Sequence, residues 1–464
     1  MSHRMPEPDV PDDLPAAPSP VPAEPHAHSH GHVHVHATGP VENLTRYAKP
    51  AVVGVLVASA LAVVLGMFFL WPGHSDHPIP LQFRSADGGP LKTADAVVVA
   101  QTRASCDAMP DSGTANGQYP NIPGGGGPCI ASTVKLTSGP DNGHFAVLMV
   151  PTNAAQSGTG PDQTADTDPA VADQPQPGQP TLHVDDKLRL SMTTGPDGAT
   201  RYAFFDFRRG SPLIVWAAAF AFAVIAVATW RGVRAIIALV FAFAVLGFFT
   251  LPSILDGHNV VAVAVVSSAL ILFVVLYLAH GFNLRTSSAL LGTLVSLLLA
   301  GLLSYWAIKS LSLTGLSGEN TASLQLYQGS ISLSGLLLAG FVIGTLGVLN
   351  DVTITQASAT FELAAMPGQT RLSAFRAAMR VGRDHIASTV YTLVFAYAGS
   401  ALPLLLLFSV AAQPFSSMIT GEEVAIELAR TFVGGIALAM SVPFTTAIAA
   451  SLVALPTSRR AAAH

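Results

Sequence analysis

The chain has 464 residues, of which 50% are hydrophobic and only 11% are charged, and this composition excludes an average soluble globular protein. Long uncharged apolar runs indicate a multi-pass membrane protein instead. The formal net charge of -5 gives no indication of nucleic-acid binding, so no nucleic acid is expected among the partners.

The first 45 residues are rich in Pro, Ala and His and contain few apolar residues, which predicts a disordered cytoplasmic tail (1–45). Six histidines alternate along it: His26, His28, His30, His32, His34 and His36. In an extended chain their imidazoles would share one side, where a divalent metal such as zinc, nickel or copper can bind. Nothing in the tail fixes a geometry, so incidental metal binding is the favoured interpretation, and no other cofactor is indicated.

The first predicted transmembrane helix occupies 46–71, with its apolar run from Ala51 to Trp71. Arg46 and Lys49 precede that run, which places the N-terminus in the cytoplasm by the positive-inside rule.

A hydrophilic segment, 72–210, follows and is exoplasmic in this topology. Its only cysteines, Cys106 and Cys129, are candidates for a disulfide in that compartment. Flexible inserts are expected at 111–128 and 152–180. The five strand-like runs predict a small β-barrel or open sandwich, and they lie at 96–102, 130–136, 145–150, 182–191 and 201–207.

Seven more apolar runs of about spanning length follow Ser211. They lie at roughly 212–230, 235–252, 259–280, 287–308, 331–355, 387–410 and 429–455. If successive spans cross the membrane in alternating directions, most arginines lie in cytoplasmic loops. The short outer loops then hold Lys309 as their only basic residue. The predicted fold class is therefore a polytopic α-helical membrane protein with about eight transmembrane helices plus a small exoplasmic β-rich domain. The membrane domain covers 211–456, the tail 457–464 is cytoplasmic, and the lipid bilayer is the expected partner.

The sixth predicted span turns polar toward its C-terminal end without any turn signal. A carboxylate at membrane depth is costly and indicates function. The alternative is that Asp351 lies just past the lipid edge, in interfacial solvent. The polar positions recur at i, i+4, i+7 and i+11 and so share one helix face: Asp351, Thr355, Ser358 and Glu362.

Three glycines precede this stripe in the same predicted helix. Gly340, Gly344 and Gly347 have the spacing that lets helix backbones approach closely in a bilayer. We therefore interpret them as helix-packing residues.

The next predicted span begins with Asp384 and His385, on the side of the membrane where Asp351 leaves it. A short loop joins the two helices, so they are expected to be neighbours. Together with the stripe, Asp384 and His385 would form a cation or proton pathway near the inner surface. The alternative is that Arg380 and Arg383 neutralise these carboxylates as interfacial ion pairs.

The last predicted span contains Glu427 and Arg430, three residues apart. The pair could brace the helix or hold an anionic ligand. A structural ion pair is favoured, because Arg430 has its counter-charge within the same helix.

A series of short motifs follows in order along the C-terminal half. They are His280-Gly281-Phe282-Asn283, Leu313-Thr314-Gly315, Gly344-Thr345-Leu346-Gly347 before Asp351, Gly382-Arg383-Asp384, Ala396-Tyr397-Ala398-Gly399-Ser400, Leu402-Pro403-Leu404 and Val442-Pro443-Phe444-Thr445. Taken together, these motifs resemble the YibE/F-like family of multi-pass bacterial membrane proteins over roughly 180–455. Asn350 precedes Asp351 where small or apolar residues are usual in that family, and Asp185 replaces a glycine in a Gly-Asp-Lys strand. The resemblance implies a location in a bacterial plasma membrane, and no particular activity.

These features favour a secondary transporter or permease for an ion or small solute. No G-x-x-x-x-G-K-[ST] loop is present, so transport would be secondary or would use a separate ATPase. The alternative is a membrane sensor or assembly protein that acts through the exoplasmic domain. An intramembrane aspartyl protease built on Asp351 and Asp384 is the only enzyme considered, and it is disfavoured because the Gly-x-Gly-Asp signature is absent. The substrate and the oligomeric state are not predicted.

Overall fold

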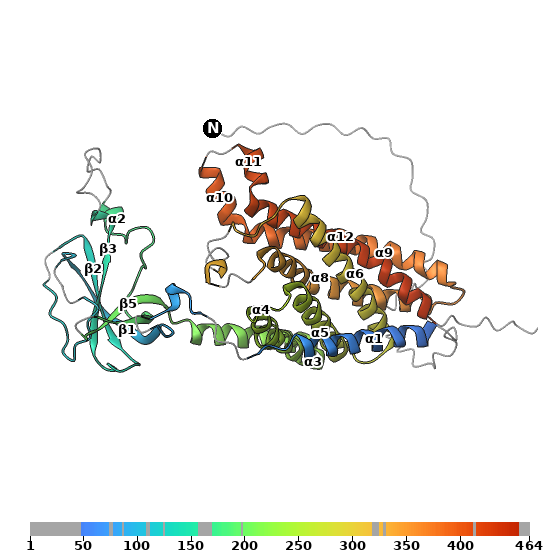
Figure 1. Cartoon of the computed structure of the whole chain (residues 1–464), viewed down its shortest axis with the longest axis horizontal. Coiled ribbons are helices and arrows are strands. Elements are labelled where there is room, and N and C mark those ends of the chain that lie inside the picture. The colour runs from blue at the N-terminus through green and yellow to red at the C-terminus, as the bar shows by residue number, and fades with distance from the viewer. Residues whose placement is uncertain are drawn as a thin grey trace, which may run out of the picture. The chain divides into compact units, whose positions relative to one another are not determined.

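A computed structural model describes residues 48–453, except 74–77, 86–87, 108–111, 124–125, 156–168, 196–197, 318–323, 328–330 and 412–413 (Figure 1). The six alternating histidines and the tail 457–464 lie outside the described residues. The described part is mostly helical and contains one small sheet domain.

The sheet domain is a single five-stranded antiparallel sheet with strand order β3-β2-β1-β4-β5. Each strand overlaps one of the predicted runs. Inward-facing apolar side chains of all five strands form its core, in agreement with the alternation expected of a half-buried sheet. The strands are β1 (Lys92–Ala104), β2 (Cys129–Leu136), β3 (Phe145–Pro151), β4 (Lys187–Thr194) and β5 (Thr200–Phe207).

A short extended segment closes this sheet between its two edge strands. The Gly113 amide donates to the Val147 carbonyl of β3 (2.9 Å), and the Tyr202 amide of β5 donates to the Gly113 carbonyl (2.7 Å). The Tyr202 side chain is buried, and its hydroxyl donates to Asp141 (2.8 Å). Burial, together with that carboxylate, raises the pKa of Tyr202 well above its usual range. Both edge strands, β3 and β5, thus gain a hydrogen-bond partner.

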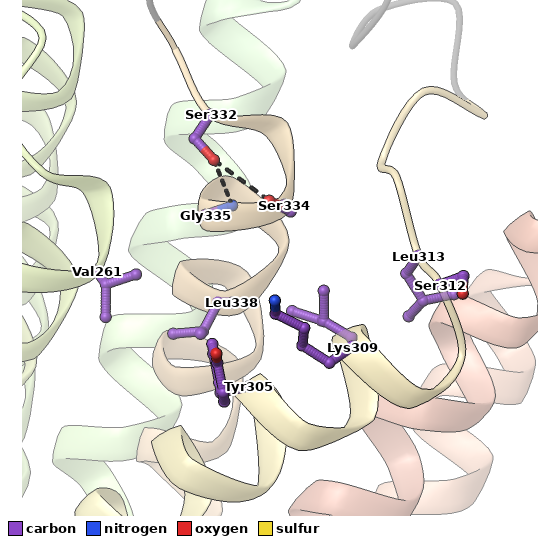
Figure 2. Close-up of a pocket in the computed structure, with 10 residues that line it drawn as sticks. Val261, Tyr305, Lys309, Ser312, Leu313, Ser332, Ser334, Gly335 and Leu338 are labelled. Atoms are coloured by element: carbon purple, nitrogen blue, oxygen red, sulfur yellow. Dashed lines mark hydrogen bonds between the residues drawn. The ribbon is translucent and has the colours of Figure 1, made fainter.

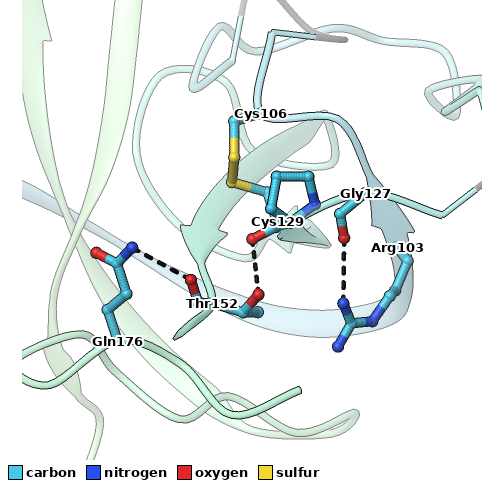
Figure 3. Close-up of a disulfide and its surroundings, with 7 residues drawn as sticks. Arg103, Cys106, Gly127, Cys129, Thr152 and Gln176 are labelled. Atoms are coloured by element: carbon cyan, nitrogen blue, oxygen red, sulfur yellow. Dashed lines mark hydrogen bonds between the residues drawn. A yellow bond between two sulfur atoms is a disulfide. The ribbon is translucent and has the colours of Figure 1, made fainter. Parts of the chain in front are cut away.

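Cys106 and Cys129 form a disulfide between the end of β1 and the start of β2 (Figure 3). Gly127 lies beside this bridge, so close to the end of β1 that a Cβ there would contact the Ala104 carbonyl. Arg103 donates to the Gly127 carbonyl (3.1 Å) and fixes the returning chain.

Six helical segments of the described chain are long and apolar enough to cross a membrane, or seven if the bent pair α9–α10 is one span. The bend between α9 and α10 is 55°. The segments are α1 (Ala48–Phe69), α3 (Gly210–Val245) continued by a π-helical turn (Leu246–Thr250) and α4 (Leu251–Leu255), α5 (Val260–His280), α6 (Leu284–Ser310), α8 (Leu333–Ala364) and α12 (Glu422–Leu452), with α9 (Arg371–Ser400) and α10 (Leu402–Val410) as the bent pair.

The chain reverses direction inside α3. Thr229 leaves the helical conformation (φ 52°, ψ -129°). A Cβ on Gly232 would lie 2.6 Å from the Val224 carbonyl, although residues eight apart in a continuous helix are separated by about 12 Å along its axis. The two halves of α3 are therefore antiparallel, and they match the two spans predicted at 212–230 and 235–252.

Helix α8 is the centre of the bundle and packs against α5, α6, α9 and α12. The close approaches occur at glycines of the neighbouring helices. A Cβ on Gly292 of α6 would contact the hydroxyl of Thr445 and lie 3.0 Å from its Cβ, and one on Gly382 of α9 would lie 2.5 Å from Val442. These contacts bring α6 and α9 against α12.

The helix-packing interpretation of the three predicted glycines needs correction. Gly340 and Gly347 have open space at their Cβ positions, and Gly344 faces only the Tyr397 hydroxyl (3.2 Å). They lie on the exposed side of α8, because spacing alone does not tell which face of a helix meets a neighbour.

We predict that Gly292→Ala destabilises the protein, whereas Gly347→Ala does not. The added methyl at 292 is forced into Thr445, and such overpacking costs about 1–3 kcal/mol. The methyl at 347 enters open space and replaces the poorer helix former. Thermal unfolding of both variants in detergent micelles measures the difference, and equal midpoints would contradict the packing described.

Candidate functional site

The predicted polar stripe lies on the exposed face of α8. Asp351 and Thr355 are exposed, and the Thr355 hydroxyl donates to the Asp351 carbonyl one turn earlier (2.8 Å). Ser358 is partly buried. The stripe therefore does not point into the centre of the bundle.

Glu362, the last member of the stripe, forms an ion pair with Arg285 at the start of α6 (2.6 Å). Both side chains are about half exposed or more. Glu362 is eleven residues beyond Asp351, which corresponds to about 16 Å along the helix. The structure thus separates Glu362 from Asp351 and gives it a partner on another helix.

A second polar stripe, which the sequence reading missed, lies on the buried face of α8. It consists of Thr353, Gln356 and Thr360, all buried, at i, i+3 and i+7. Thr353 shares a hydrogen bond with Thr293 of α6 (2.6 Å). We call these three residues the inner stripe.

Gln356 joins three helices at the middle of the inner stripe. Its amide nitrogen donates to the Ala378 carbonyl of α9 (3.0 Å) and to the Thr446 hydroxyl of α12 (2.7 Å). Gln356 is buried in the protein, so its amide has no water to bond instead and these bonds hold the three helices together. The inner stripe is therefore structural.

A cavity of about 350 Å³ lies between the second half of α3, α5 and α8. Its wall is mostly apolar, with many small side chains. Within the described part of the chain, the buried Oδ1 of Asn350, a lining residue, has no hydrogen-bond partner. The lining residues are Ala235, Ala238, Leu239, Ala242, Ile271, Leu272, Val275, Ala279, His280, Leu346, Gly347 and Asn350.

Charged groups gather at one end of this cavity. His280 lines it, and Asp351 and Arg231 lie close enough for their charges to act on the imidazole. His280 is the last residue of α5, and Arg231 follows the reversal at Thr229. Asp351 therefore lies level with the helix ends, while α8 continues for thirteen residues, about 20 Å, beyond it.

Asp384 and His385 are exposed on α9, and in the described residues no hydrogen bond or ion pair joins either side chain to Asp351. Gly382 marks the face of α9 that meets the bundle, and Asp384 lies about 200° around the helix from it. Likewise, Asp351 lies about 140° around α8 from Gln356, which faces α9. The structure does not bring the two carboxylates together.

Glu427 and Arg430 form the predicted pair, with both Glu427 oxygens near one Arg430 nitrogen (2.8 and 3.0 Å). The guanidinium also lies over the rings of Phe341 in α8 (5.4 Å) and Tyr397 in α9 (5.7 Å). Cation–π contacts of this kind are favourable when partly desolvated. The arrangement links α12 to α8 and α9, as expected of a brace.

Comparison with known families decides the assignment of the helical region. The model of the YibE/F-like protein family matches residues 216–455, slightly more than half of the chain. The chain belongs to the YibE/F-like family. The match begins inside α3, so it covers the cavity, the inner stripe and the Glu427–Arg430 pair, and leaves out the sheet domain. Searches of curated proteins and of solved structures found no match to the chain.

The described residues of the YibE/F-like region contain no cluster of side chains suited to bind a metal ion. In the parts of the chain that the structure describes, no three His, Cys, Asp or Glu side chains are grouped as metal ligands. The cavity beside Asn350 and Asp351 is consequently its clearest candidate site.

We predict that Glu362→Gln and Gln356→Leu differ in their effect on the YibE/F-like bundle. An exposed ion pair contributes about 0–1 kcal/mol, so losing the Arg285 partner should be nearly neutral. Replacing the Gln356 amide removes its two buried hydrogen bonds to α9 and α12, each of which contributes about 0.5–1.5 kcal/mol. Chemical denaturation in micelles compares them; a larger loss for Glu362→Gln would refute the structural role of the inner stripe.

Proposed function

We propose that this YibE/F-like protein is a secondary permease that passes an ion or small solute along α3, α5 and α8, past Asn350 and Asp351. The observation that carries the proposal is the cavity of about 350 Å³ at which a buried Asn350 oxygen lacks a partner, next to an ionisable side chain in an apolar helix.

The chemistry of this site favours a solute that offers positive charge or hydrogen-bond donors. Asn350 Oδ1 and the Asp351 carboxylate are both acceptors. Leaving a buried acceptor unpaired costs about 1–3 kcal/mol, and rotation of the Asn350 side chain toward a bound donor would recover this cost. Arg231 supplies positive charge at this end of the cavity when no solute is bound.

The proposed setting is a bacterial plasma membrane crossed eight times, with both termini in the cytoplasm. The reversal inside α3 and the bent α9–α10 pair support this count, since each adds one crossing to the six apolar segments. In that topology the arginines of the helix turns face the cytoplasm, and Asp351 lies at the inner membrane surface.

A sensor or assembly role is the second candidate, and a cleft in the sheet domain favours it. The cleft has a volume of about 360 Å³ and is lined by Thr102, Tyr119, Asn121 and Thr133 among others. Thr133 is almost fully buried, and its hydroxyl has no partner in the described part of the chain. Deletion of 72–210 separates the two roles: a permease core would keep its flux, whereas a binding module could not act.

We predict that Asp351→Asn abolishes or strongly reduces flux through the purified protein in liposomes. The panel covers protons, zinc, manganese, magnesium and simple anions, since the sequence does not name the solute. Glu362→Gln is the matched control, because it removes a carboxylate from the same helix that is already paired with Arg285.

Flux that disappears only in Asp351→Asn supports the pathway proposed. Equal flux in wild type and Asp351→Asn would remove Asp351 from it. Absence of flux for the whole panel would favour the sensor or assembly role, with organic solutes tested next.

A further inference from the structure

A second pocket lies at the opposite end of α8 from Asp351. It has a volume of about 460 Å³ and opens between the C-terminal end of α6, the N-terminal end of α8 and the start of α5 (Figure 2). We call it the Lys309 pocket. Its lining residues are Val261, Tyr305, Ile308, Lys309, Ser312, Leu313, Ser332, Ser334, Gly335 and Leu338.

The charge of this pocket is positive. Lys309 is its only ionisable side chain apart from Tyr305, and Figure 2 shows it extending from α6 toward α8. Its ammonium lies 5.8 Å from the centre of the Tyr305 ring, and no carboxylate forms an ion pair with it among the residues that the structure describes. An ammonium in this position has donors left for an anion.

Polar groups of α8 face the same space. The hydroxyls of Ser332 and Ser334 lie 3.3 Å apart, and the Ser332 hydroxyl caps the helix by accepting from the Gly335 amide (3.1 Å) (Figure 2). The N-terminal end of this long helix carries partial positive charge, which adds to that of Lys309. The pocket therefore combines a full cation, hydroxyl donors and a helix dipole.

The remaining wall is hydrocarbon. Val261, Ile308, Leu313 and Leu338 line it, so an ion without an apolar part would leave much of the pocket unfilled. A ligand that fits both walls has an anionic head and an apolar chain.

We propose that the Lys309 pocket binds an anionic amphiphile, a phosphate or carboxylate group carried on a hydrocarbon chain. A membrane lipid and a free amphiphilic acid share this chemistry. The pocket does not depend on the proposed permease function: Gly335 and Asp351 are sixteen residues apart, about 24 Å along α8, and the test below measures binding without flux.

The experiment uses the full-length protein in nanodiscs of phosphatidylcholine mixed with phosphatidylglycerol, analysed by native mass spectrometry. Wild type should retain phosphatidylglycerol, and Lys309→Gln should retain at least about tenfold less, the effect of losing one charge-assisted hydrogen bond. Lys135→Gln, the same change on an exposed lysine of β2, is the matched control and should behave as wild type.

A second variant tests the shape of the pocket while keeping its charge. Ser334 is exposed, so Ser334→Phe is tolerated by the fold and places a ring at the mouth of the pocket. It should lower retention although Lys309 is intact. If wild type retains phosphatidylglycerol, unchanged retention in both Lys309→Gln and Ser334→Phe would overturn the proposal, and it would identify Lys309 as an interfacial anchor only.

A soluble arm distinguishes the source of the ligand. Decyl phosphate is added to delipidated protein in a neutral detergent, with inorganic phosphate as the comparison. Decyl phosphate should stabilise wild type, and this stabilisation should be lost in Lys309→Gln. If phosphatidylglycerol is also enriched in the nanodiscs, the ligand is a membrane lipid. If it is not enriched, the ligand is a free amphiphile. Equal stabilisation by inorganic phosphate would refute the need for a hydrocarbon chain.

Discussion

The helix bundle depends on one constraint, the pairing of polar groups that apolar surroundings cannot hydrate. Along the inner stripe of α8 this constraint is met: Thr353 pairs with Thr293, and Gln356 pairs with α9 and α12. These bonds position α8 against three neighbours and so fix which of its faces remain free. Asn350 is informative because its buried oxygen breaks the pattern in the same helix.

Much of the fold could be predicted because hydropathy reports apolar length directly. The two halves of α3 were separable from the sequence, since Arg231 and Arg234 interrupt the apolar run near the reversal at Thr229. The helical spacing of Asp351, Thr355, Ser358 and Glu362 predicted that α8 continues past its apolar span at 331–355. The start of α9 at Arg371 was not predicted, because the predicted span at 387–410 was limited to the apolar part of that helix. The polar turns at the end of α8 and the start of α9 are helical, but a hydropathy pattern does not detect polar helical turns.

The candidate site was predictable only in part, for a geometrical reason. The Asp351 stripe and the inner stripe both have helical spacing and are offset by two residues, so they lie on nearly opposite faces of α8. Sequence spacing does not tell which of the two meets the bundle. The unpaired state of Asn350 and the approach of His280 depend on residues more than sixty positions away, and no local pattern records them.

The cavity and the Lys309 pocket are both built on the contact between α5 and α8, at its two ends. Between them Phe341 and Val342 of α8 are almost fully buried in one apolar cluster. That cluster closes the route along α8 in the conformation described, because close-packed side chains leave no space for a hydrated solute. The proposed permease function would therefore require α5 and α8 to separate at this seam. Among the described residues no ion pair joins α5 to α8, so opening of the seam is opposed by apolar packing.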